Sequence, residues 1–120
     1  MARILVIDDD KQVRLAVRWI LEHEGYEVLD ACDGKKGMEV FQGNSVDLVI
    51  TDIIMPEKEG IETITELKQA QPVLKIIAMS GSGAVDPRVY LSVAEKVGAM
   101  RTLVKPFSKD ELLETVSALL

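Results

Sequence analysis

The sequence predicts an α/β fold in which one sheet of parallel strands is covered by helices on both faces. Short apolar runs alternate with amphipathic stretches along all 120 residues, and the connections between them are only a few residues long. No internal repeat or low-complexity linker interrupts the alternation. Because neighbouring parallel strands need a crossover, this order predicts repeated βα units in a single domain, residues 1–120.

Aliphatic and β-branched runs predict five strands. Their ranges are Ile4–Ile7, Tyr26–Ala31, Asp47–Asp52, Val73–Met79 and Arg101–Val104. Such runs lack polar alternation and are typical of strands buried on both faces. After the third run, Pro56 cannot continue a strand ladder. We therefore expect Asp52 to begin a loop rather than lie inside a strand, with its carboxylate reachable from solvent.

Capping residues, prolines and glycines predict five helices between these strands. The first lies between Asp10 and Gly25, the second spans 34–41, the third 61–70, the fourth 87–97, and the last follows the capping box Ser108-x-x-Glu111. In the first helix, helical spacing predicts a core face with Arg14, Arg18 and Glu22 on the opposite side. The residues that share the core face are Val13, Ala16, Val17, Ile20, Leu21 and Glu24.

Composition and charge narrow the classes of function. The formal net charge is −6 and the basic residues are scattered, which argues against a nucleic-acid surface and suits a divalent cation or a basic partner. The single cysteine, Cys32, excludes an internal disulfide, and its position after an apolar run predicts a buried, reduced thiol. No apolar run approaches membrane length, and no secretory signal is present, so we expect a cytoplasmic protein.

Four separated polar pieces follow predicted strands. They are the pair Asp8 and Asp9, then Asp52, Ser80 and Lys105. Each piece alone could be a helix cap or a solvated strand end. In a parallel sheet, however, all four meet at the carboxyl edge, where open α/β proteins form their sites.

The residue types at this edge indicate phosphoryl chemistry. Three aspartates in close proximity repel one another unless a cation joins them, and Mg²⁺ prefers oxygen ligands. A lysine and a serine hydroxyl can bind phosphoryl oxygens, and an ionised aspartate can act as the nucleophile without a general base. The set therefore predicts a phosphoryl group held on Asp52.

These motifs carry a family resemblance that covers essentially the whole chain. Asp8-Asp9, Asp52-x-x-Met55-Pro56 with Gly60 beyond, Ser80, and Lys105-Pro106-Phe107 occur in the order and spacing of the receiver domain of bacterial two-component response regulators, which the sequence resembles. The resemblance implies a doubly wound, flavodoxin-like sheet of strand order 2-1-3-4-5. It also implies a cis peptide bond between Lys105 and Pro106.

The resemblance further implies how such a site works. Asp52 would take a phosphoryl group from a phosphohistidine on a sensor histidine kinase or a histidine phosphotransfer protein. Asp9 and Asp52 would bind Mg²⁺, or Mn²⁺ in its place, directly, with the backbone carbonyl of Ile54 as a further ligand and Asp8 acting through water. Ser80 and Lys105 would bind the phosphoryl oxygens. The chain would assist its own phosphorylation and dephosphorylation but would not otherwise be an enzyme.

One position departs from the family pattern. Relatives couple the movement of the serine to an aromatic residue three positions before the lysine, and here that residue is Thr102. We expect the surface formed by the fourth helix, fifth strand and fifth helix to report phosphorylation, with loop 81–86 becoming ordered. Expected partners of this output are a C-terminal output domain, a downstream protein or a phosphorylation-dependent second copy, with no direct contact to nucleic acid or membrane.

Leu15 and Trp19 lie away from the predicted core stripe of the first helix. They either pack beneath a neighbouring element or are exposed and extend the surface that meets the histidine partner. His23, within a charged helix end, is expected to be a surface residue.

Three other classes of protein agree less well with these residues. A flavin-binding electron carrier would need a phosphate-binding loop where Asp8, Asp9 and Asp10 would repel an anion. A phosphatase of the haloacid dehalogenase type would leave Asp52 unexplained and would need a cap domain. A receiver-like module that binds partners without phosphate is favoured mildly by Thr102 and opposed by the complete acidic site.

Overall fold

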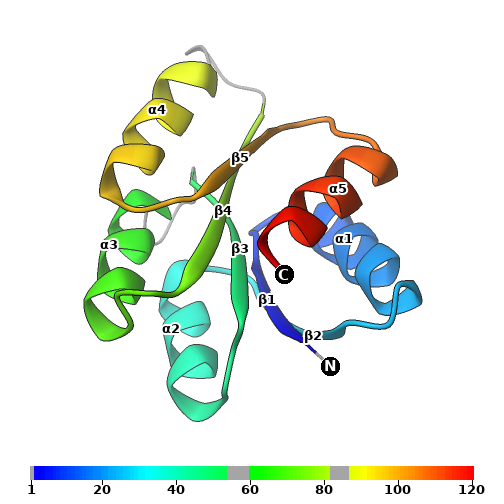
Figure 1. The fold of residues 1–120 in the computed structure, drawn as a ribbon. Coiled ribbons are helices and arrows are strands. Elements are labelled where there is room, and N and C mark those ends of the chain that lie inside the picture. Colours follow the sequence, from blue (N-terminus) through cyan, green and yellow to red (C-terminus); the bar gives the residue numbers. More distant parts are fainter. Residues whose placement is uncertain (1, 54–59, 82–86) are drawn as a thin grey trace.

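The structure is a computed structural model that describes residues 2–53, 60–81 and 87–120. Its five strands are all parallel and form one sheet in the order β2-β1-β3-β4-β5 (Figure 1). The strands are β1 (Arg3–Ile7), β2 (Glu27–Ala31), β3 (Leu48–Asp52), β4 (Lys75–Ser80) and β5 (Arg101–Val104). The predicted α/β class and the strand order implied by the family resemblance are both confirmed.

Helices cover both faces of this sheet, as predicted. The first layer holds α1 (Lys11–His23) and α5 (Lys109–Leu119), and the second holds α2 (Gly34–Gly43), α3 (Gly60–Ala70) and α4 (Pro87–Val97) (Figure 1). In β1 the side chains alternate: Ile4 and Val6 pack toward α1 and α5, whereas Leu5 and Ile7 pack toward the other layer. None of the described helices is long and apolar enough to cross a membrane.

Several helix ends follow the local signals. The Asp10 carboxylate accepts hydrogen bonds from the N–H groups of Gln12 and Val13, and the predicted capping box of Ser108 and Glu111 is present. Gly25, just after α1, has a φ of 93°, in the left-handed region that favours glycine.

Three expectations about burial were wrong. Asp52 does not begin a loop: it is the last residue of β3, and pairing with β4 continues beyond it because Ile53 N–H bonds to the Met79 carbonyl. Asp52 is only 7% exposed. The strand predicted from Val73 begins at Lys75 instead, and Val73 is exposed. Cys32 is half-buried rather than buried.

The core face of α1 is also rotated from the predicted one. Val17 and Leu21 are buried as expected, but Ala16 is exposed. Arg14 and Arg18 are half-buried and form ion pairs with Asp30 of β2 rather than pointing away from the sheet. Ion pairing to the neighbouring strand lets these two charged side chains lie partly covered.

Candidate functional site

The predicted convergence of polar residues at the carboxyl edge of the sheet is present. Asp8 follows β1, Asp52 ends β3, Ser80 ends β4, and Lys105 follows β5. Carboxylate oxygens of Asp8, Asp9 and Asp52 lie within 4.8 Å of one another. Four strands that are separated in sequence thus bring their polar ends to one point.

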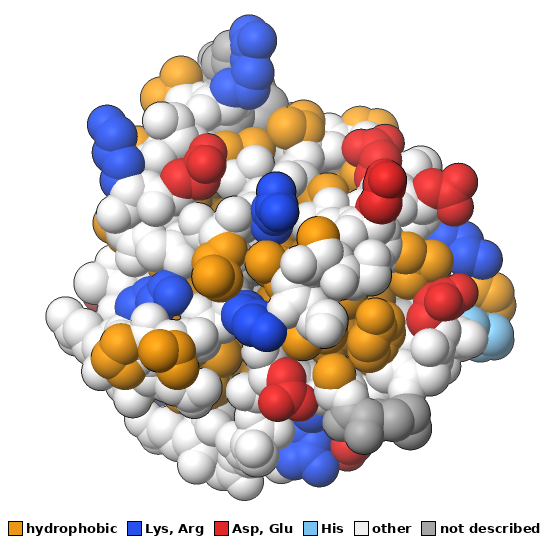
Figure 2. Space-filling view, in the orientation of Figure 1, with side chains coloured by type: hydrophobic (Ala, Val, Ile, Leu, Met, Phe, Trp, Pro, Cys, Tyr) orange, Lys and Arg blue, Asp and Glu red, His pale blue; other side chains and the backbone are white. Residues whose placement is uncertain are grey.

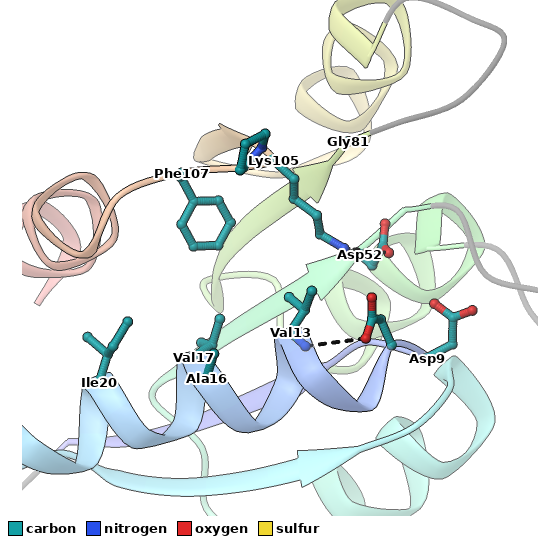
Figure 3. A pocket seen from close by; sticks show the side chains of 11 residues that line it. Asp9, Val13, Ala16, Val17, Ile20, Asp52, Gly81, Lys105 and Phe107 are labelled. Carbon is teal, nitrogen blue, oxygen red and sulfur yellow. Dashed lines mark hydrogen bonds and ion pairs between the residues drawn. The ribbon is translucent and has the colours of Figure 1, made fainter.

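Lys105 reaches into this acidic cluster. Its Nζ lies 2.7 Å from Oδ2 of Asp8 and 3.0 Å from Oδ2 of Asp52, and Figure 3 shows the side chain pointing at Asp52. Asp8 is fully buried and Asp52 nearly so, whereas Asp9 is exposed. Because these two carboxylates are largely removed from water, the ammonium of Lys105 replaces part of the solvation that they lose on folding.

The lysine does not fully offset the burial of Asp8. Burial raises the pKa of the Asp8 carboxyl above its ordinary value, and the negative charge of Asp52 adds to this shift. The hydrogen bond and charge of Lys105 and the hydrogen bond from the Asp10 N–H reduce the shift without cancelling it. The pKa of Lys105 itself is raised: burial would lower it, but the hydrogen bonds and charges of Asp8 and Asp52 outweigh that effect. Separately, the cluster contains three carboxyl groups and Lys105 contacts two of them, so its acidic groups outnumber the cation beside them.

The raised pKa gives a pH prediction for Asp8. A folded-state pKa above the unfolded value means that Asp8 stabilises the fold most at pH below its unfolded pKa, and that this stability is lost as the pH rises through the folded pKa. We expect Asp8→Asn to raise the melting temperature by a few degrees at pH 7 in EDTA, because the amide resembles the protonated acid. Thermal melts from pH 3.5 to 7.5 should show the gain disappearing in acid, and a variant less stable than the wild type at pH 7 would contradict the prediction.

The excess of carboxyl groups makes the cluster suitable for a hard divalent cation. Its donors are carboxylate oxygens, which Mg²⁺ prefers, and a cation would neutralise the repulsion among Asp8, Asp9 and Asp52. Ile54, whose carbonyl was expected as a further ligand, lies outside the described residues.

Ser80 adds a polar group of a different kind. The residue is fully buried, and within the described part of the chain its hydroxyl has no hydrogen-bond partner. A buried hydroxyl without a partner is costly, so the position fits a ligand that would accept this hydrogen bond.

The connections around Ser80 and Lys105 are tight. Lys105 N–H donates to the Ser80 carbonyl at 2.8 Å, and a Cβ added at Gly81 would lie 2.7 Å from Lys105 Cβ. The predicted cis bond between Lys105 and Pro106 is present. Glycine at 81 therefore allows the β4 and β5 ends to lie close together.

A cleft of about 590 Å³ opens beside Asp52, between α1 and the segment after β5. Figure 3 shows Asp9, Asp52 and Lys105 at one end of it and apolar side chains of α1 opposite Phe107 along its length. On the outer surface of α1, Leu15 and Trp19 are exposed, Trp19 by 57%, and the Trp19 ring stacks on His23. The exposed alternative for Leu15 and Trp19, and the surface position of His23, are confirmed.

The proposed switch position is only partly described. Thr102 lies in β5 opposite Ala78 of β4 and is half-buried. Residues 82–86, which make up almost all of the loop expected to become ordered, lie outside the described residues.

Two residues that contact the backbone of the site were not predicted from the sequence. Arg14 donates from Nη1 to the Asp8 carbonyl at 2.8 Å, and the Thr51 hydroxyl donates to the Asp52 carbonyl at 2.9 Å. Helical spacing predicted only that Arg14 lies on the face of the first helix opposite the core. No local pattern relates its guanidinium to a carbonyl on the preceding loop.

Fold and site together define a class: a doubly wound α/β domain with three clustered aspartates and a lysine at the carboxyl edge of its parallel sheet. The model of the response regulator receiver domain family matches residues 4–117. The chain belongs to this family, whose members are the receiver domains of two-component systems.

Curated relatives agree with this assignment. The transcriptional regulatory protein CpxR of Klebsiella pneumoniae is 35% identical over 120 residues, which are 100% of this chain and 50% of that protein. The response regulator MprA of Mycobacterium sp. strain KMS is 36% identical over 118 residues, 98% of this chain and 50% of its own length. The chain thus spans about half the length of these relatives.

Solved structures show the same fold. The chemotaxis protein CheY4 of Vibrio cholerae matches with a TM-score of 0.90 at 30% identity, covering 100% of this chain and 99% of that one. The response regulator TrrA of Thermotoga maritima, solved in complex with Mg²⁺ and BeF, matches with a TM-score of 0.88 at 34% identity over 100% of both chains.

Proposed function

We propose that this receiver domain is a phosphorylation-dependent signalling switch whose phosphoacceptor is Asp52. The observation that carries the proposal is the position of Lys105 Nζ, 3.0 Å from the Asp52 carboxylate, in a cluster with Asp8 and Asp9 at the end of an open cleft. The proposed donor is a phosphohistidine of a sensor histidine kinase or a histidine phosphotransfer protein, and the proposed location is the cytoplasm.

The reaction needs no general base. An oxygen of the ionised Asp52 carboxylate attacks phosphorus, forming a P–O bond while the P–N bond to the donor imidazole breaks and its electron pair returns to the ring. Lys105 stabilises the charge on the phosphoryl oxygens, and the Ser80 hydroxyl donates a hydrogen bond to one of them. The chain also assists the later hydrolysis, in which water attacks phosphorus, the P–O bond to Asp52 breaks and inorganic phosphate leaves, and it acts on no other substrate.

Mg²⁺, or Mn²⁺ in its place, would be held by Asp8, Asp9 and Asp52, with the Ile54 carbonyl as the further ligand that the family resemblance implies. When bound, the cation supplies charge neutralisation around the phosphoryl group. The grouping of three carboxylates within 4.8 Å of one another supports this part of the proposal, and TrrA, a structural relative, was solved with Mg²⁺ and BeF.

The proposed output surface is formed by α4, β5 and α5. Phosphorylation adds roughly 1.5 to 2 negative charges and strong acceptor oxygens, which would draw the unpartnered Ser80 hydroxyl and the β4 end toward Asp52. Figure 2, viewed toward the β5 edge, shows apolar side chains exposed on this side. Exposed apolar residues of α4, β5 and the segment before β5 are Val89, Val93, Met100 and Val104.

Because Thr102 is small, we propose that the signal passes through the loop after Ser80 rather than through an aromatic rotamer.

The expected recipient of the signal is an output domain, a downstream protein or a second phosphorylated copy. Relatives such as CpxR and MprA are regulators about twice as long as this chain, which supports an output domain. On the input side, the cleft beside α1 fits the imidazole of the donor, and Leu15 and Trp19 extend that contact surface.

Incubation with acetyl phosphate and Mg²⁺, followed by intact mass measurement, tests the phosphoacceptor. We expect one added phosphoryl group on the wild type and none on Asp52→Asn or in EDTA. Asp47→Asn is the matched control, because Asp47 lies just before the opposite end of the same strand and is exposed. It should be phosphorylated like the wild type.

An adduct that persists in Asp52→Asn would contradict the assignment of Asp52. Failure of the wild type to form an adduct, together with no response to beryllofluoride in Trp19 fluorescence, would instead favour a module that binds partners without phosphate.

A further inference from the structure

Arg14 links the acidic loop to the far edge of the sheet. Its guanidinium Nη1 donates to the Asp8 backbone carbonyl at 2.8 Å, and its Nε lies 3.7 Å from a carboxylate oxygen of Asp30 on β2. The Arg14 side chain is only 14% exposed. Within the described residues Nε has no hydrogen-bond partner, so the guanidinium binds the Asp8 carbonyl directly and is attracted to Asp30 by charge. A planar guanidinium is more rigid than a flexible ammonium and directs its donors more precisely.

The group that Arg14 holds is part of the candidate cation site. The Asp8 carbonyl shares a peptide plane with the N–H of Asp9, so its direction determines where the Asp9 backbone begins. The Asp8 N–H is bound to the Ala31 carbonyl of β2, and the Asp8 Oδ1 accepts from the Asp10 N–H. Arg14 supplies the contact on the carbonyl side of this turn.

Asp9 is the carboxylate that most needs such support. Asp8 and Asp52 are buried beside Lys105, whereas Asp9 is exposed at the start of the turn. A ligand on an exposed turn loses conformational freedom when it binds a cation, and a fixed peptide plane reduces that loss.

We propose that Arg14 is a positioning residue for the divalent cation: with Asp30 it fixes the Asp8–Asp9 peptide so that the Asp9 carboxylate faces those of Asp8 and Asp52. The inference rests on the proposed function, since it concerns the cation of that site. Partners that orient metal ligands contribute about 10- to 100-fold to metal affinity in other proteins.

Electrostatics alone predicts the opposite effect. Arg14 carries a positive charge near the cluster, and that charge repels Mg²⁺. If charge were its only contribution, replacing Arg14 by a neutral residue would tighten Mg²⁺ binding, and replacing it by lysine would change little. Positioning predicts weaker binding in both cases, so the sign of the change separates the two explanations.

Arg18 offers a matched control on the same helix. Its Nη1 donates to Asp30 at 2.7 Å and its Nε pairs with Glu22, and these partners lie on β2 and α1 rather than on the acidic loop. A variant of Arg18 therefore weakens the same connection between α1 and β2 while leaving the bond to the Asp8 carbonyl in place.

The test is the Mg²⁺ dissociation constant of the unphosphorylated protein, measured by calorimetry at constant ionic strength. We expect Arg14→Gln to bind Mg²⁺ about tenfold more weakly than the wild type, as for other orienting partners of metal ligands. The dissociation constant of Arg14→Lys should lie between them, because its ammonium keeps the positive charge beside Asp30 but lacks the rigid planar geometry that directs a donor to the Asp8 carbonyl. The Mg²⁺ dissociation constant of Arg18→Gln should remain within about twofold of the wild-type value. The Asp9 amide resonance in NMR should shift in Arg14→Gln more than in Arg18→Gln.

Equal or tighter Mg²⁺ binding by both Arg14 variants would overturn the inference, as would an equal loss in Arg18→Gln, which would indicate a general effect on the sheet edge. Thermal melts in EDTA identify a variant that does not fold, and Arg14→Lys then decides between the two outcomes. A folded wild type that binds no Mg²⁺ would overturn the proposed function and this inference with it.

Discussion

Lys105→Met is expected to lower the free energy of unfolding by about 3 kcal/mol at pH 7 in EDTA, because removing one partner of a buried ion pair leaves charge uncompensated. The variant leaves the Asp8 and Asp52 carboxylates, both largely buried, without an ammonium that lies 2.7 and 3.0 Å from them. Methionine retains most of the apolar stem of the lysine, so the loss reports charge more than packing. Urea denaturation measures it, and Lys35→Met, at an exposed position of α2, is the control.

The loss should depend on pH and on Mg²⁺ in a defined way. Asp8 already has a raised pKa, and without Lys105 that pKa rises further, so protonation relieves the repulsion as the pH falls. The destabilisation should therefore be largest at neutral pH and shrink toward pH 4. Saturating Mg²⁺ should recover part of it. A loss that is independent of both pH and Mg²⁺ would show that Lys105 acts mainly through packing.

Gly60→Ala is the second substitution with a large expected effect. A Cβ at this position would collide with the Asp52 carbonyl oxygen and the Ile53 Cα, which are backbone atoms that cannot rotate away. Gly60 N–H also bonds to the Ile53 carbonyl at 3.2 Å, which holds the start of α3 against the end of β3. Overpacking of this kind costs about 1 to 3 kcal/mol. We also expect slower phosphorylation, because the displaced backbone carries Asp52.

Gly43→Ala is the matched control for this prediction. Gly43 ends α2, and a Cβ there would meet nothing within 4 Å. Alanine restricts the unfolded chain more than glycine does, so this variant should be unchanged or more stable by up to about 1 kcal/mol. Urea midpoints for both variants provide the comparison. Equal stability of Gly60→Ala and Gly43→Ala would contradict the packing argument.

The sequence alone predicted the α/β class, the element order and the members of the acidic site. Apolar runs and helical periodicity are local patterns, and the capping signals at Asp10 and Ser108 act within a few residues, so both can be read without tertiary contacts. The convergence of Asp8, Asp52 and Lys105 followed because parallel strands place their carboxyl ends at one edge.

Only the tertiary structure decided how deeply these groups are buried and what holds them. Asp52 was expected to be open to solvent, but pairing beyond the end of β3 and the close approach of Gly60 cover it. The rotation of α1 toward β2 brought Arg14 to Asp30 and to the Asp8 carbonyl. These features depend on contacts between segments far apart in the chain. Local periodicity describes each segment separately and carries no information about such contacts.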